Sequence, residues 1–214
     1  MEDRPRDGSR HRRGGVLVTG TGAAAGPPDI AVLDLGAEVR AATAGAALDA
    51  VSLAVAAMRE ALVAAGLVER DLATAALTLT PYYDDFPVVA GYQASLALKA
   101  RSRSVEAVGA LVVAAASAAG DAARIRGIAF EHSDPRGLET SARELAWADA
   151  RARAEQLAAL AGRPLGEPVS IEEGVAHPGR PPGPVMRAMA SADLPVDAGE
   201  SSVCVQLAVR WSFA

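Results

Sequence analysis

Aromatic residues are scarce in this chain of 214 residues and make up only 4% of it. This composition disfavours a site in which stacked aromatic rings hold a nucleic acid or a planar cofactor. The hydrophobic content is nevertheless 50% and the mean hydropathy is +0.17, enough for a packed core in one ordinary domain or two small ones. Alanine, valine and leucine must fill that core, so we expect closely packed helices.

Cysteine and histidine are also rare. Cys204 is the single cysteine, which excludes an internal disulfide. The three histidines, His11, His132 and His177, lie far apart and lack the spacing of zinc ligands. Cys204 has neither a histidine nor another base near it in the sequence, so we interpret it as structural rather than nucleophilic. We therefore predict no metal site and no cofactor.

The sequence has neither a long apolar run nor an excess of basic charge. Its apolar runs, including residues 107–119, are shorter than the roughly 20 residues that a membrane-spanning helix needs. There are 26 acidic and 21 basic residues, and the resulting net charge of −5 opposes binding to a polyanion. We expect neither a membrane span nor a nucleic-acid partner.

Arginine is concentrated in residues 1–15, which show no apolar periodicity and are predicted to form a disordered tail. A secretory signal needs an apolar stretch of about 7–15 residues after its charges. The apolar run that follows Arg13 is too short and becomes polar at Thr19. The sequence therefore predicts a cytoplasmic protein, or a periplasmic or extracellular one if the true start lies upstream.

Three glycines, Gly20, Gly22 and Gly26, follow an apolar strand over residues 16–20 and imitate the phosphate-binding loop of dinucleotide-binding folds. That motif requires a helix directly after the glycines. Residues 30–40 instead alternate between apolar and polar side chains, as a strand does. We predict an opening hairpin, in which two strands are joined by a Gly/Pro turn. Nucleotide binding by Gly20–Gly26 is the weaker alternative.

The remaining periodicities predict three helices, over residues 43–65, 104–119 and 134–161, and five strands, over 72–80, 88–101, 124–131, 167–173 and 201–214. Ser104 is the predicted N-cap of the second helix, which is almost uncharged and should be buried on most sides or against another subunit. The third helix opens with Asp134 as its cap and Pro135 as its first residue. Residues 174–198 are rich in proline and glycine and predict an irregular loop.

The third helix is also predicted to present a packed face of small and apolar side chains, namely Ala142, Leu145, Ala146, Leu157 and Leu160. Its charged residues should form the solvated face.

The predicted turn over residues 81–87 is the most informative local feature, because it concentrates aromatic and acidic residues in a chain poor in aromatics. They are Tyr82, Tyr83, Asp84, Asp85 and Phe86. The aromatic side chains suit either a surface that binds a partner or a lid over one end of the core. The two aspartates are common turn residues, although a metal or acid/base pair is an alternative.

Several strings in fixed order resemble the SIMPL-domain family, which includes YggE-like proteins linked to oxidative-stress defence and a periplasmic immunogen. They include Leu79-Thr80-Pro81-Tyr82-Tyr83-Asp84, Val89-Ala90-Gly91-Tyr92-Gln93-Ala94-Ser95, Gly127-Ile128-Ala129-Phe130 and Ala142-Arg143-Glu144-Leu145-Ala146-Trp147. The similarity extends over nearly everything after Gly15. It implies no catalytic residues.

The resemblance implies an α+β fold in which antiparallel strands and hairpins carry three main helices, in the order ββαββαβαββ, over one SIMPL-like domain at residues 16–214. We expect a non-enzymatic protein that acts through binding or self-assembly, as a homo-oligomer or with a protein partner, and that is related to stress response. An enzyme with its site near the turn of Tyr82 to Asp85 is the main alternative.

Overall fold

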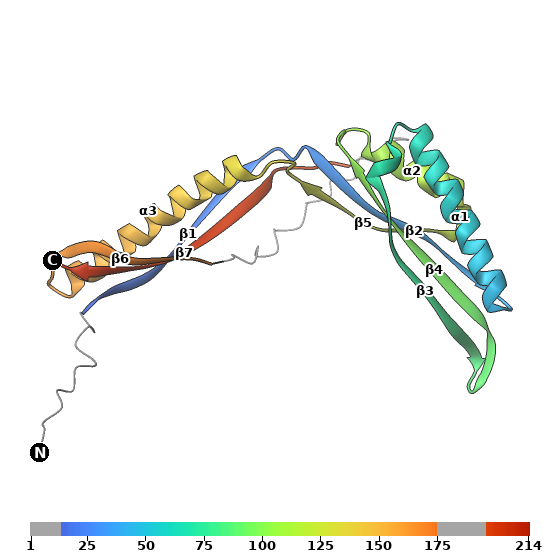
Figure 1. The fold of residues 1–214 in the computed structure, drawn as a ribbon, viewed down its shortest axis with the longest axis horizontal. Helices are drawn as coiled ribbons and strands as arrows, with labels where there is room; N and C mark the ends of the chain where they lie inside the picture. The colour runs from blue at the N-terminus through green and yellow to red at the C-terminus, as the bar shows by residue number, and fades with distance from the viewer. Residues whose placement is uncertain (1–13, 175–195) are drawn as a thin grey trace, which may run out of the picture. The chain divides into compact units, whose positions relative to one another are not determined.

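A computed structural model of the chain describes residues 14–174 and 196–214. The predicted tail over residues 1–15 and the predicted loop over 174–198 therefore lie almost entirely outside the described residues. Among the described residues, helices and strands alternate as β1(Gly15–Gly26) β2(Ile30–Ala41) α1(Ala44–Ala64) β3(Leu72–Asp85) β4(Val88–Ser102) α2(Val108–Ala119) β5(Ala123–Glu131) α3(Arg136–Leu160) β6(Leu165–Gly174) β7(Ser201–Phe213) (Figure 1). The predicted order ββαββαβαββ and the α+β class are confirmed.

The predicted domain over residues 16–214 consists of two compact units. The first unit holds β1, α3, β6 and β7, and its sheet has the strand order β1-β7-β6. The second unit holds β2 to β5 with α1 and α2, and its sheet has the order β3-β4-β2-β5. All strand pairs with a described register are antiparallel.

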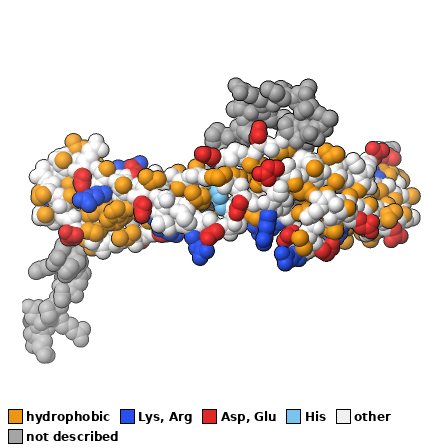
Figure 2. Space-filling model, turned by 90° about the horizontal axis from the view of Figure 1, so that it is seen from above, with side chains coloured by type: hydrophobic (Ala, Val, Ile, Leu, Met, Phe, Trp, Pro, Cys, Tyr) orange, Lys and Arg blue, Asp and Glu red, His pale blue; other side chains and the backbone are white. Residues whose placement is uncertain are grey.

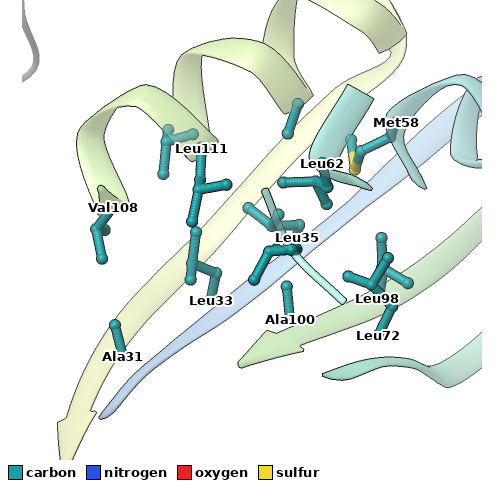
Figure 3. Close-up of a cluster of buried hydrophobic side chains, with 13 residues drawn as sticks. Ala31, Leu33, Leu35, Met58, Leu62, Leu72, Leu98, Ala100, Val108 and Leu111 are labelled. Carbon is teal, nitrogen blue, oxygen red and sulfur yellow. The ribbon is translucent and has the colours of Figure 1, made fainter. Parts of the chain in front are cut away.

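In the second unit, α1 and α2 cover one face of the sheet. The buried side chains between them are aliphatic and come from both helices and from three strands (Figure 3): Ala31, Leu33, Leu35, Met58, Leu62, Leu72, Leu98, Ala100, Val108 and Leu111. Thr43 caps α1, because its hydroxyl oxygen accepts a hydrogen bond from the backbone N–H of Ala46 at 3.3 Å. The predicted helix over residues 43–65 is thus confirmed.

The other face of this sheet is polar. The guanidinium of Arg126 crosses it, donating to the carbonyl oxygen of Leu35 at 2.7 Å and to the hydroxyl of Ser95 at 2.9 Å. It occupies the space over Gly36, where an added Cβ would lie 2.6 Å from Arg126 Nη1. Arg126 also faces Asp34 at 3.6 Å, so this side chain joins three strands of the sheet.

In the first unit, α3 packs against β1 and β7 through a row of alanines spaced four residues apart, each at most 2% exposed: Ala142, Ala146, Ala150, Ala154 and Ala158. Gly20 and Gly22 of β1 lie directly beneath this row. A Cβ at Gly20 would stand 2.2 Å from the carbonyl oxygen of Ala146. The backbones of strand and helix are therefore in contact, which only glycine and alanine permit at this distance.

This close approach corrects the predicted packed face of the third helix. Ala142 and Ala146 are buried as expected, but Leu145, Leu157 and Leu160 are 51%, 45% and 78% exposed. Leucine side chains do not fit where two backbones meet, so the helix turns its alanines inward.

The predicted opening hairpin is also wrong. β1 and β2 belong to different sheets, β1 beside β7 and β2 between β4 and β5. The glycines at 20 and 22 serve the contact with α3 and do not form a turn. A strand rather than a helix follows Gly26, so this segment lacks the helix that the alternative of nucleotide binding at Gly20–Gly26 requires.

Two helix starts differ from prediction. α2 begins at Val108 rather than after Ser104, because Ser102 and Ser104 hydrogen-bond to each other and hold a turn before the helix. α2 also buries one face rather than most sides, and Val113 is 48% exposed. Pro135 is the N-cap of α3 rather than its first residue, while Asp134 accepts a hydrogen bond from the Arg136 N–H at 3.1 Å.

Candidate interaction surface

The cluster of aromatic and acidic residues lies at the end of the β3–β4 hairpin, which runs beyond the N-terminal end of α1 (Figure 1). The prediction of a turn over residues 81–87 is wrong in its extent, because β3 continues to Asp85 and β4 starts at Val88. Only Phe86 and Pro87 connect them, through a cis peptide bond. Tyrosines favour extended backbone, and β3 is an edge strand in which Pro81 need not donate to the sheet.

Tyr82 is a structural member of this hairpin. Its ring covers Gly91 on the neighbouring strand, where an added Cβ would lie 2.8 Å from the ring and its hydroxyl. The guanidinium carbon of Arg40 stands 4.8 Å from the centre of the same ring. Arg40 is itself held by Gln93, whose Oε1 accepts from the arginine Nε at 2.7 Å. Tyr82 thus fixes the conformation of the hairpin.

Tyr83 and Phe86 form the exposed part of the cluster. Their ring centres are 5.6 Å apart and tilted by 56°, a favourable aromatic pair. Phe86 is 81% exposed and Val88 is 70% exposed, with Val89 and Tyr83 each at 44%. We call these four residues the tip surface. The structure therefore favours an exposed surface over a lid on the core, and Asp84 lies exposed beside it.

Of the two aspartates at the tip of the hairpin, the structure describes the side chain of Asp84 alone. The side chain of Asp84 makes no hydrogen bond or ion pair with any described residue, and the side chain of Asp85 lies outside the description. Within residues 14–174 and 196–214, no group of three histidine, cysteine or acidic side chains is arranged to hold a metal ion. The described surroundings of Asp84 thus include no partner for proton transfer.

The carboxylates with shifted pKa values lie elsewhere in the chain, where each accepts hydrogen bonds that stabilise the local structure. Hydrogen bonds from the side chain and backbone N–H of Arg136 lower the pKa of Asp134 to about 2. The hydroxyl and backbone N–H of Ser133 likewise lower the pKa of Asp29. The backbone N–H of Thr21, aided by Arg153, lowers that of Asp149. The sequence predicts Asp134 as a helix cap but does not reveal the contacts of Asp29 and Asp149, because folding brings their partners Ser133 and Thr21 close.

A cavity of about 370 Å³ lies in the second unit between the end of α1, the end of β4 and the start of α2. Its polar lining includes Asp71, Arg101 and Arg103, and Leu67 and Leu111 line its apolar side. Arg101 also faces Glu131 at 3.6 Å. Ser102 and Ser104 also line it, and their hydrogen bonds to each other hold the turn before α2.

Acidic, basic and apolar side chains are interspersed over the coloured face of the molecule in Figure 2. Of the features described, the tip surface is the one in which four neighbouring apolar residues are all substantially exposed.

Comparison with known proteins agrees with the order of elements. A family model described as SIMPL, protein of unknown function (DUF541), matches residues 16–211. The chain belongs to the SIMPL family. The resemblance predicted from the sequence strings is thus confirmed, and the match spans both structural units of the SIMPL chain.

Two relatives are named 26 kDa periplasmic immunogenic protein, one from Brucella melitensis biotype 1 and one from Brucella abortus strain S19. Each is 32% identical over 216 residues, which covers 91% of this SIMPL chain and 82% of the relative. A solved structure titled as AtUAH in complex with (S)-hydroxyglycine matches 60% of this chain and 34% of its own, at 14% identity and a TM-score of 0.27. That similarity is too low to carry an argument.

The described helices of the SIMPL chain include none that is long and apolar enough to cross a membrane. The predicted cytoplasmic location finds no support in the relatives, which are named as periplasmic.

Proposed function

We propose that this SIMPL protein acts by binding rather than by catalysis, and that it assembles with further copies of itself. The observation that supports this proposal is the tip surface, in which Phe86 and Val88 are 81% and 70% exposed. Removing apolar surface from water contributes about 2.5 kcal/mol for each 100 Å². An exposed aromatic pair flanked by valines is therefore a favourable contact for another protein surface.

The rigidity of the hairpin strengthens the proposal. Tyr82 is packed on Gly91 and beneath Arg40, so the strand beside the tip surface is ordered before any partner arrives. Binding by a preorganised surface loses less conformational entropy than binding by a flexible one. Aromatic side chains also have few rotatable bonds, which reduces the cost further.

Light scattering on the purified chain tests the proposal. We expect a mass that is a multiple of 21.8 kDa and a shift toward one chain for Phe86→Gln. Leu53→Gln is the matched control, because Leu53 is 74% exposed in the same unit, on α1, and should leave the mass unchanged. A wild-type chain that stays a monomer at high concentration, or an activity that is lost in Asp84→Ala, would overturn it.

We further propose a periplasmic location and a role in stress defence. The location is supported by the two Brucella relatives, which are named as periplasmic proteins. The role is supported by the resemblance to YggE-like proteins. Fractionation of the source cells tests the location, and recovery of the protein only with cytoplasmic markers would contradict it. Survival of cells lacking the protein under peroxide tests the role.

A further inference from the structure

Within residues 14–174 and 196–214 the two sheets have four edge strands, and three of them are protected against pairing with another chain. An unprotected edge offers free N–H and C=O groups to any extended strand. On β1, two side chains of α3 bind these groups directly. Asp149 accepts from the Thr21 N–H at 2.8 Å, and Arg153 donates to the Thr19 carbonyl oxygen at 3.1 Å.

The edges at β6 and β5 are protected by proline and charge. β6 contains Pro168 and three glutamates, Glu167, Glu172 and Glu173. β5 carries two arginines that reach inward over the sheet: Arg124 faces Glu38 at 3.4 Å and Arg126 faces Asp34 at 3.6 Å. Inward charges and prolines are devices by which natural sheets prevent edge pairing.

β3 differs from these three edges. It has no charged residue from Leu72 to Tyr83, and its side chains from Ala73 to Pro81 are exposed. Among the described residues β4 is its one neighbour in the sheet. Its pairing with β4 shifts register at Ala75, which forms a bulge, and again between Tyr82 and Asp85, while Pro81 has no N–H to offer to another strand. Between Ala75 and Pro81, residues 76–80 pair regularly with residues 97–93 of β4, and no described strand pairs with the outer edge of these five residues.

We propose that this edge pairs with β3 of a second copy, antiparallel and about a two-fold axis at Thr78. The inference rests on the proposed self-assembly and names its interface. Leu77-Thr78-Leu79 reads the same in both directions, so Leu77 of each copy lies opposite Leu79 of the other. These leucines are 57% and 39% exposed, and pairing covers them on the side of the sheet that carries the helices.

The irregular positions select this register. With the axis at Thr78, the bulge at Ala75 lies opposite Pro81, so both fall just outside the paired segment. An axis at Leu77 would place the bulge opposite the regular residue Leu79. A shift by one residue in the pairing would set leucine against threonine and mismatch the two faces.

The absence of charge favours a second copy as the occupant. In a symmetric pair of identical strands, each charged residue lies opposite the same residue of the other copy or opposite one of its near neighbours in the sequence. Like charges directly opposite each other destabilise a sheet. Residues 72–83 carry none. Five paired residues on each strand are a short contact, and the same register brings the tip surface of each copy beside the start of β3 in the other. The edge and the tip surface thus belong to one interface.

Disulfide trapping tests the register. Every chain carries Cys204→Ala, so that the introduced thiol is the only one. Thr78→Cys lies on the axis, and mild oxidation should link it to its counterpart as a dimer on a non-reducing gel. Thr80→Cys is the control, since it is exposed on the same face but lies four residues, about 13 Å along the strand, from its counterpart. It should not link to itself.

A mixed sample provides the second arm. Ala76→Cys and Thr80→Cys chains face each other in this register, so their mixture should link while neither links alone. If the wild type assembles but Thr78→Cys links no more than Thr80→Cys, the β3 pairing is overturned and self-assembly stands. Linking to a different protein in place of a second copy overturns the proposed occupant. A monomeric wild type overturns both proposals.

Discussion

The carboxylate of Asp149 on α3 accepts a hydrogen bond from the backbone N–H of Thr21 on β1, at 2.8 Å. The same carboxylate pairs with Arg153 one turn further along the helix. A helix side chain therefore satisfies a strand donor that would otherwise face water or another chain, and the first unit gains a polar contact beside its alanine core.

This contact makes the stability of the first unit depend on pH. The pKa of Asp149 is lowered from its ordinary value of 3.8, chiefly by the Thr21 N–H, so its contribution is complete above 3.8 and is lost as pH falls through the lower, folded value. We expect Asp149→Asn to lower the urea midpoint at neutral pH and to match the wild type in strong acid. Glu155→Gln, which alters an exposed pair with Arg151, should have little effect at either pH.

Substitution of Gly20 tests the contact between strand and helix. A Cβ at this position would lie 2.2 Å from the Ala146 carbonyl oxygen, so the two backbones must separate. We expect Gly20→Ala to reduce the free energy of unfolding by about 3 kcal/mol or more, measured by denaturant titration. Gly137→Ala in α3 meets nothing within 4 Å and should stabilise the chain by about 0.5–1 kcal/mol. Equal effects of the two substitutions would contradict the packing described.

The two tyrosines of the hairpin should respond differently to truncation. Tyr82→Ala uncovers Gly91 and removes the contact with Arg40, so we expect a loss of about 1 kcal/mol in unfolding free energy. Tyr83→Ala removes a side chain that is 44% exposed and should leave stability within about 0.5 kcal/mol while lowering the assembled mass. Thermal unfolding and light scattering on both variants separate the two roles.

Met58 tests the core of the second unit. It is fully buried between the helices and the sheet (Figure 3), so Met58→Ala leaves a cavity and should cost about 2–5 kcal/mol in chemical unfolding. Leu53→Ala on the same helix changes a side chain that is 74% exposed and should cost little. A small loss for Met58→Ala would mean that the core collapses around the deleted side chain.

Local patterns in the sequence predict most of the helices and strands, but they do not predict which strands lie side by side. The stripe Leu48, Val51, Val55, Met58 and Leu62 predicts a helix and its buried face, and the structure buries the last four and leaves Leu48 half-buried. The alternation in β7 predicts its buried residues from Val205 to Trp211, while Val203 and Phe213 at its ends are half-buried. Alternation in β1 and β2 shows that each is a strand, but it contains no information on which strand lies beside it. The prediction of an opening hairpin failed for this reason.

One available signal could have identified the contact between β1 and α3. Gly20 and Gly22 share one face of a strand, and alanine recurs every fourth residue from 142 to 158. Two successive positions without side chains on the buried face of a strand allow a helix with small residues to approach its backbone closely. The apolar tip at Phe86 could be located from composition, whereas its exposure depends on how far the hairpin extends beyond α1.

The alanine row of α3 also limits how this protein can change over evolutionary time. Alanine has no side-chain rotamers, so burying it costs no side-chain entropy. The row therefore packs with little loss of conformational entropy in a chain that has few aromatic residues. Larger residues at Ala142, Ala146 and Ala150 would strike β1, larger residues at Ala154 and Ala158 would overpack a buried position, and glycine would weaken the helix. Very few substitutions should therefore be tolerated at these five positions during evolution, whereas many should be tolerated on the solvated face of the same helix.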